Sequence, residues 1–262
     1  MSDLTAAPPR HRVGVDPRIR RRQVEIRRAE GRRRLLVVLG VLAALALAGV
    51  AWAVTRSPLL DVDRVTVLGA DRSGAAAVRS AAAVGRHQPM VDVDRAGAAR
   101  RVEALPWVLR AEVRRSWPAT VRIRVTERTA RAVTSAVGGG WALVDPAGRV
   151  LDRVPAAPPG LPLVEGVPQA GAPGSTVPPA TADPLRVAVS LPPGLAPRVA
   201  SVAAGARGVE LHLRPTGVVV LGAADAVGAK LGAALTVLGA VDGRTVATLD
   251  VRIPQTPVLT RR

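Results

Sequence analysis

The side chains that could perform catalysis are few and widely separated in this 262-residue chain. Its three histidines, His11, His87 and His212, lack the short spacing of a metal-ligand pair. His212 alternates with leucines, so we expect it to face solvent from a strand. Asp92 and Asp94 are spaced closely enough for acid–base chemistry, but a helix-like segment follows them. We therefore predict that they cap this helix.

Motifs typical of enzymes do not occur in the sequence. There is no phosphate-binding loop, nucleophile elbow or His-Glu-x-x-His pattern. The absence of cysteine excludes thiolate chemistry and disulfides. The glycine run at 138–140 precedes a strand-like segment rather than a helix, so we interpret it as a loop. The sequence predicts no catalytic, cofactor-binding or metal-binding residue, no cofactor and no small-molecule substrate, and thus a protein that is not an enzyme.

The strong basic charge, +17 with a pI near 11.9, raises nucleic-acid binding as a hypothesis. However, arginines are spread along the chain, and four tryptophans with no Phe or Tyr give no platform for stacking bases. We predict no nucleic-acid partner. A charge-driven binder of nucleic acid or lipid stays an alternative, which a salt titration would test because phosphate-driven binding weakens steeply with salt.

Residues 35–54 form an uncharged run of twenty residues. A helix of this length spans the hydrocarbon core of a bilayer, which is about 30 Å thick. The preceding residues 1–34 contain eleven arginines and four acidic residues. This basic tail predicts a cytoplasmic N-terminus and C-terminal domains outside the cytoplasm, in a single-pass type II protein of the plasma membrane.

A cleaved export signal is the alternative for this segment. Residues 51–53 read Ala-Trp-Ala, which resembles a cleavage site, and Arg33-Arg34 resembles a twin-arginine signal. The apolar run is longer than the 7–15 residues usual in a signal, and the region before it is also long. We favour an uncleaved anchor.

The segment after the span predicts an α+β unit with the order β-α-α-β-β. A strand at 60–68 is followed by helices at 75–84 and 94–105. Two strands follow, in which Leu109, Ala111 and Val113 and then residues 121, 123 and 125 alternate with polar residues. Such strands have one apolar face, against which two helices can pack.

The remaining chain predicts a mixed β domain with a helix. Strands are expected at 141–144, 150–151, 209–213, 218–221 and 249–253, with a turn at 242–243. Asp225 is expected to open a helix. The Pro- and Gly-rich stretch 155–184 is interpreted as a long surface loop.

Three motifs lie within the β-α-α-β-β unit. They read Leu-Pro-Trp-Val at 105–108, Val-Arg-Arg-Ser-Trp-Pro-Ala-Thr at 113–120 and Val-Thr-Glu-Arg at 125–128. Beside a membrane helix, this pattern resembles the bacterial cell-division family FtsQ, called DivIB in many Gram-positive bacteria, in which the unit is a POTRA domain. Ala130 departs from the family's Glu-Arg-x-Pro, which bears on the domain junction.

The resemblance implies a non-catalytic divisome scaffold, enriched at the septum, that helps control septal peptidoglycan synthesis. It implies FtsB- and FtsL-like bitopic partners, bound outside the membrane. The expected parts are a tail (1–34), a transmembrane helix (35–54), a POTRA domain (57–130), a β domain (131–258) and a C-terminal tail (259–262). In the family, FtsB binds the C-terminal part of the β domain, so we expect a free edge on the last strand. The candidate partner-binding residues are Lys230, Thr248, Leu249, Asp250, Val251, Arg252 and Ile253.

The other alternative is an exported POTRA-containing interaction module of a translocation or assembly system. Such a module would need a cleaved signal and a following β-barrel. No series of long lipid-facing strands follows in this sequence, so the alternative has less support.

Overall fold

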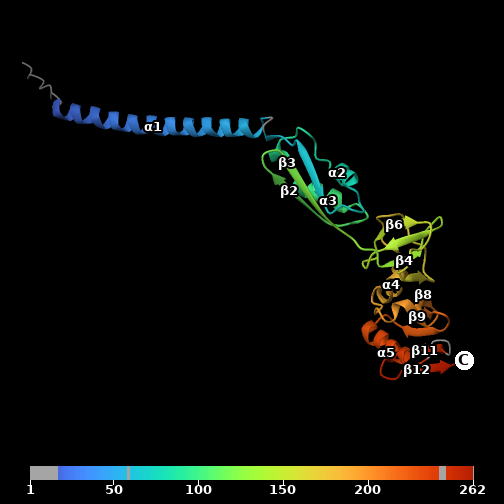
Figure 1. Ribbon diagram of the computed structural model, residues 1–262. Coiled ribbons are helices and arrows are strands. Elements are labelled where there is room, and N and C mark those ends of the chain that lie inside the picture. Colours follow the sequence, from blue (N-terminus) through green and yellow to red (C-terminus); the bar gives the residue numbers. More distant parts are fainter. Residues whose placement is uncertain (1–16, 58–59, 242–245, 262) are drawn as a thin grey trace, which may run out of the picture. The chain divides into compact units, whose positions relative to one another are not determined.

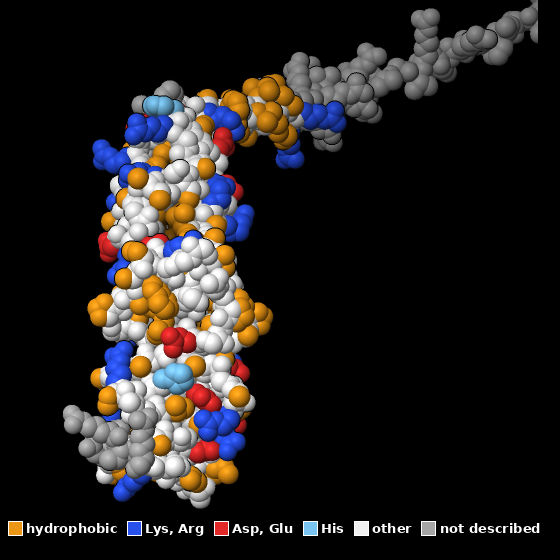
Figure 2. Space-filling model, turned by 90° about the vertical axis from the view of Figure 1, so that its right-hand side faces the viewer, with side chains coloured by type: hydrophobic (Ala, Val, Ile, Leu, Met, Phe, Trp, Pro, Cys, Tyr) orange, Lys and Arg blue, Asp and Glu red, His pale blue; other side chains and the backbone are white. Residues whose placement is uncertain are grey.

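The computed structural model describes residues 17–57, 60–241 and 246–261, with side chains from Arg33 onward. The chain divides into two compact units, which meet between Leu60 and Asp61. The first contains helix α1 (Pro17–Thr55). Its segment Arg33–Thr55 is long and apolar enough to cross a membrane, and none of it is buried. Figure 2 shows this segment as a continuous apolar surface with basic side chains beside it.

The second unit begins with a three-stranded sheet and two helices. The elements follow in the order β1 (Arg64–Leu68), α2 (Ala75–Ala82), α3 (Arg95–Glu103), β2 (Val108–Ser116) and β3 (Thr120–Glu127). The strand order is β1-β3-β2, with β1 parallel and β2 antiparallel to the central β3. Both helices lie on one face of the sheet (Figure 1). This is the predicted β-α-α-β-β arrangement.

The core of this sheet follows the predicted alternation, with one exception. Val121, Ile123 and Val125 are buried against the helices, as are Ala111 and Val113 of β2. Leu109 was expected on the same face, but it is 53% exposed, and its neighbour at 108 is buried instead. The register of β2 against β3 shifts between Val108 and Arg110, so a bulge reverses the facing of side chains at this end.

The rest of the second unit is built on a nine-stranded sheet. The strand order is β12-β11-β10-β9-β8-β7-β4-β5-β6. The bounds are β4 Ala132–Ser135, β5 Trp141–Val144, β6 Val150–Val154, β7 Leu163–Glu165, β8 Val199–Gly205, β9 Gly208–Leu213, β10 Val218–Gly222, β11 Val246–Asp250 and β12 Val258–Arg261.

Two helices, α4 (Ala182–Val189) and α5 (Val227–Gly239), pack on this sheet and enclose its main core. Leu185 of α4 and Leu231 and Leu238 of α5 are buried there with the apolar side chains of the strands. A smaller cluster of Val133, Leu143 and Leu151 covers the strands nearest the POTRA-like unit. The fold is α+β, as predicted.

The stretch 155–184 is not the continuous surface loop that its composition suggested. It supplies β7, which lies between β4 and β8 and is parallel to both. It also begins α4. Val164, Ala170 and Val177 from this stretch are buried. Pro and Gly interrupt the segment with turns. Its apolar residues nevertheless form the strand that joins β4 to β8. The turn expected at 242–243 lies outside the described residues.

Candidate partner-binding site

The last predicted strand is not the free edge of the sheet. Residues 248–250 lie in β11, which pairs with β10 on one side and with β12 on the other. The extra strand comes from residues expected in part to form a C-terminal tail. Among the strands that the structure describes, β12 is therefore the edge. Strand β11 also ends early, because the chain bends after Asp250 and leaves Ile253 63% exposed.

The backbone of β11 divides its hydrogen bonds between its two neighbours. The Val251 N–H donates to the Val220 carbonyl of β10 at 2.9 Å. Successive residues of a strand direct their N–H and C=O groups to opposite sides. Leu249 therefore also faces β10, whereas Thr248 and Asp250 direct their backbone groups toward β12.

The register also determines which backbone groups of β12 do not form hydrogen bonds with β11. Val258 lies opposite Asp250, and Thr260 lies opposite Thr248. These two residues of β12 thus pair with β11. Leu259 lies between them, so its N–H and C=O point to the open side of the sheet. An open edge of this kind can accept a strand from another protein.

A shallow hollow of about 510 Å³ lies beside this edge. It is lined by Asp250, Arg252, Ile253, Thr256 and Val258, so three of the predicted residues meet there. The Arg252 side chain donates to both oxygens of the Asp250 carboxylate, from Nε at 3.1 and 2.9 Å and from Nη2 at 2.7 Å. These bonds lower the pKa of Asp250. Ile253 and Val258, each 63% exposed, add apolar surface.

Lys230 does not belong to this hollow. Its side chain is buried in α5, and its Nζ donates to the Ala223 carbonyl at 2.9 Å and to the Asp225 carboxylate. This hydrogen bond lowers the pKa of Asp225. Asp225 was expected to begin the helix, but α5 begins at Val227, and its N-cap Ala226 makes no side-chain bond. Lys230 thus anchors the entry to α5, and we infer no direct partner contact for it.

Arg128 connects the POTRA-like unit to the larger sheet. Its Nη1 donates to Asp145 Oδ2 at 2.6 Å, and its Nε donates to the Val108 carbonyl at 3.0 Å. The other oxygen of Asp145 accepts the N–H groups of Ala147 and Arg149 in the β5–β6 turn. Because both side chains are largely buried, this pair holds the end of β3 against that turn.

Of the neighbouring motif residues, Glu127 holds the β1–α2 loop within the POTRA-like unit, and Trp107 packs against the larger sheet. The Glu127 carboxylate accepts bonds from the N–H groups of Arg72 and Ser73 and from the Ser73 hydroxyl. Trp107 packs against the small apolar cluster of the larger sheet, and the Arg72 guanidinium lies 5.0 Å from its ring centre. Ala130 packs there too.

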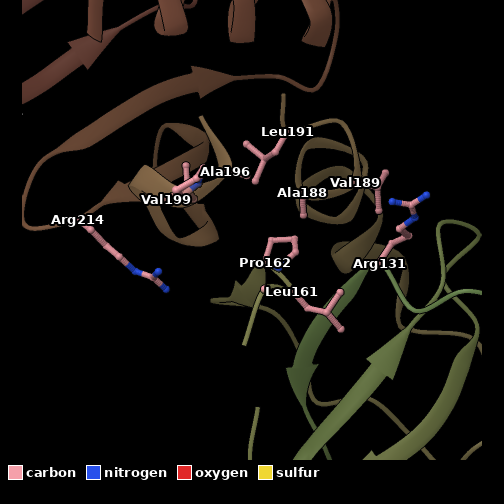
Figure 3. A pocket seen from close by; sticks show the side chains of 11 residues that line it. Arg131, Leu161, Pro162, Ala188, Val189, Leu191, Ala196, Val199 and Arg214 are labelled. Atoms are coloured by element: carbon pink, nitrogen blue, oxygen red, sulfur yellow. The ribbon is translucent and has the colours of Figure 1, made fainter. Parts of the chain in front are cut away.

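A second hollow, of about 420 Å³, lies beside the end of α4 (Figure 3). Leu191, Ala188 and Pro162 lie between Arg131 and Arg214, which stand on opposite sides of it. The lining contains no His, Asp, Glu or Ser, so it supplies no general base or nucleophile. We assign no reaction to it.

The aspartate and histidine side chains that were considered first for catalysis have structural roles or contacts. Asp94 Oδ1 accepts the Gly97 N–H at 2.9 Å and so caps α3, as predicted. His212 is only partly exposed and lies with Nδ1 3.4 Å from the Ser201 hydroxyl, rather than fully in solvent. Among the residues that the structure describes, no three His, Asp or Glu side chains are grouped as a metal site requires.

Sequence reasoning missed β12 and the exposed Val258. The available signal was the short run Val258-Leu259-Thr260 after Pro257, which has the β-branched composition of a strand. Four residues at a chain end are too few for periodicity alone to identify a strand.

An apolar helix able to span a membrane, a β-α-α-β-β unit and a large mixed sheet define a POTRA-containing protein with a single candidate span in the described chain. Residues 60–128 match the family model of the FtsQ-type POTRA domain. This match supports the FtsQ resemblance over the translocation-module alternative.

Several curated proteins named "Cell division protein FtsQ" are similar to this chain. The one from Streptomyces bingchenggensis is 39% identical over 51% of this chain and 51% of its own length. The one from Mycobacteroides abscessus is 31% identical over 86% of this chain and 68% of its own length. The chain belongs to the FtsQ family of cell division proteins. It spans about half the length of the Streptomyces relatives that it matches.

Proposed function

We propose that this protein is a membrane-anchored, non-catalytic scaffold of the cell-division machinery. In this proposal α1 crosses the plasma membrane with the basic tail in the cytoplasm, and the second unit works outside it at the division septum. There it binds FtsB- and FtsL-like single-pass proteins and helps control septal peptidoglycan synthesis. The family membership supports the division role.

The observation that carries the binding mode is the open edge of β12. Leu259 offers backbone N–H and C=O groups on that side, so a partner segment can extend the sheet through main-chain bonds. The hollow beside the edge adds selectivity. Its exposed Ile253 and Val258 favour an apolar side chain on the partner strand, next to the Asp250–Arg252 pair.

This binding mode depends little on individual charged side chains. The Asp250 and Arg252 charges satisfy each other, so either truncation should weaken partner binding only modestly. Loss of a main-chain donor should be more serious, because main-chain bonds carry this binding mode.

Co-purification from dividing cells tests the proposal. The full-length wild-type chain should retain FtsB- and FtsL-like proteins, and a Leu259→Pro chain of equal abundance should not. Equal recovery of both partners with the two chains would refute strand addition at β12. Absence of division proteins from the wild-type preparation would refute the scaffold role itself.

A further inference from the structure

The outer face of the POTRA sheet carries a group of exposed arginines. We call it the arginine face and define it by Arg64 of β1, Arg110 and Arg114 of β2, and Arg122 and Arg124 of β3. All five are exposed on the side opposite the apolar core. The acidic residues next to them are Glu112 and Asp63, and Glu112 is bonded to Arg114 at 2.6 Å.

The strand register places one pair of like charges on this face, and it also sets Glu112 opposite Arg124. Arg114 lies directly opposite Arg122 across the β2–β3 pair. Directly opposed like charges destabilise a sheet, and opposite charges would fit these positions equally well. Arg64, Arg122 and Arg124 make no side-chain hydrogen bond or ion pair with the part of the chain that the structure describes. The arrangement therefore favours an anionic ligand outside the fold.

An exposed tryptophan adjoins one end of the arginine face. Trp117 lies at the turn between β2 and β3 and is 53% exposed. The same turn holds the start of β1, because the Ala119 carbonyl accepts the N–H groups of Asp63 and Arg64 at 2.9 and 3.2 Å. Trp117 and Arg64 thus lie at the end of the POTRA domain where the chain arrives from α1.

The length of the connection limits how far this end can be from a membrane. Arg64 follows Thr55, the last residue of α1, by nine positions. Nine residues extend at most about 30 Å. Near the end of α1, Arg56 lies over the ring of Trp52 at 5.4 Å, an aromatic and basic pair of the kind found at the membrane interface. Where α1 crosses a bilayer, this connection keeps Arg64 within about 30 Å of the point at which the helix leaves it.

We propose that the β2–β3 hairpin end docks on the bilayer that α1 crosses, with Trp117 in the interface and Arg64 and Arg122 on anionic phospholipid headgroups. Tryptophan prefers this interface, and arginines near an anionic surface gain electrostatic attraction. The docking rests on the membrane crossing in the proposed function, but not on the binding edge at β12. It would fix the orientation of the POTRA domain instead of leaving it free on its tether.

Fluorescence quenching on the full-length chain in lipid nanodiscs tests the docking. The chain has no cysteine, so Ser116→Cys carries a single dye beside the hairpin end, and Ser80→Cys carries one on α2 at the opposite face. Nitroxide-labelled headgroups then report proximity. We expect strong quenching of the Ser116 position with phosphatidylglycerol, weaker quenching with phosphatidylcholine or high salt, and little quenching of the Ser80 position.

A matched pair of double variants distinguishes the effect of the arginine face on docking from the effect of total charge. Arg64→Gln with Arg122→Gln should weaken docking about 25-fold, at about fivefold per arginine. Arg79→Gln with Arg100→Gln removes equal charge from the exposed side of the helices and should leave docking unchanged. Trp117→Ala should weaken docking without changing its salt dependence.

Three results would overturn the docking. The first is an unquenched dye at position 116 in anionic discs. The second is equal quenching in both lipids, and the third is an equal loss of quenching in the two double variants. The first would assign the arginine face to a protein partner instead. A chain that fails to stay in the discs would refute the membrane crossing and the docking with it, whereas retention without quenching refutes the docking alone.

Discussion

Arg128 donates to Asp145 across the boundary between the POTRA sheet and the larger sheet, with 2.6 Å between Nη1 and Oδ2. Their side chains are only 17% and 4% exposed. Arg128 belongs to the Val-Thr-Glu-Arg motif, and Asp145 begins the turn after β5. The motif that identified the family in the sequence thus has a physical role at the domain boundary.

Asp145→Ala should destabilise the chain by roughly 3–5 kcal/mol, because it leaves a largely buried guanidinium and two turn N–H groups without their acceptor. Denaturant unfolding of the full chain in detergent, followed by tryptophan fluorescence, measures the change. Asp183→Ala is the control. It breaks an ion pair with Arg186 in which both side chains are 58% exposed, so its cost should be below about 1 kcal/mol. Equal costs would contradict the junction role.

Ile123→Asp should remove the cooperative unfolding of the POTRA domain. The Ile123 side chain is fully buried, and a carboxylate there has no cation within the apolar core. The cost is several kcal/mol. Arg122→Glu on the other face places a carboxylate opposite Arg114, so it should leave the melting temperature unchanged or slightly higher. A melt of Ile123→Asp like that of the wild type would show that the face assignment is wrong.

Glu127 should make the POTRA domain sensitive to acid. Partial burial raises its pKa, but the bonds from Ser73 and from the Arg72 N–H outweigh this and leave the pKa below its ordinary value of 4.5. A depressed folded-state pKa stabilises the fold above pH 4.5, and this contribution is lost as the pH falls through the folded-state pKa. Glu127→Gln should therefore make the free energy of unfolding depend less on pH below pH 4.5. An unchanged acid slope would contradict this assignment.

The predictions from sequence succeeded where the deciding interactions are local. Val121, Ile123 and Val125 alternate over five residues, and that period alone fixes which face is buried. The Asp94 cap likewise depends on the next three residues. The POTRA order and the face of its core followed from such patterns.

The errors have long-range causes. Strand β7 is three residues long, and its partners, β4 and β8, lie about thirty or more residues away along the chain. Its neighbours, rather than its own composition, make it a strand. The bulge that exposes Leu109 depends on the pairing of β2 with β3. At the candidate site, residues 248–250 were placed on the correct strand, but β12 covers the edge that they were expected to present.

The proposed orientation predicts the result of reporter fusions. A reporter that is active only outside the cytoplasm should be active when fused after Arg131 and silent when fused at Arg28. The reason is the arginine-rich tail before the apolar segment Arg33–Thr55. A stable, membrane-free product that begins near Val54 would instead support a cleaved signal.

Two proline substitutions in β12 distinguish partner binding from folding. Leu259 directs its N–H to the open side, so Leu259→Pro should abolish capture of FtsB-like partners and change the unfolding of the β domain little. Thr260 directs its N–H to β11, so Thr260→Pro should lower the melting temperature of the domain. Pull-down of partners and thermal melts of the full chain measure both effects.

A side-chain control is needed because Leu259 is partly buried against the main core. Leu259→Ala removes that packing but keeps the N–H, so it should bind partners normally and show any packing loss in the melt alone. The strand-addition mechanism requires that Leu259→Pro fail in the pull-down where Leu259→Ala succeeds. If the proline and alanine variants capture partners equally, the main chain of β12 does not form the binding edge.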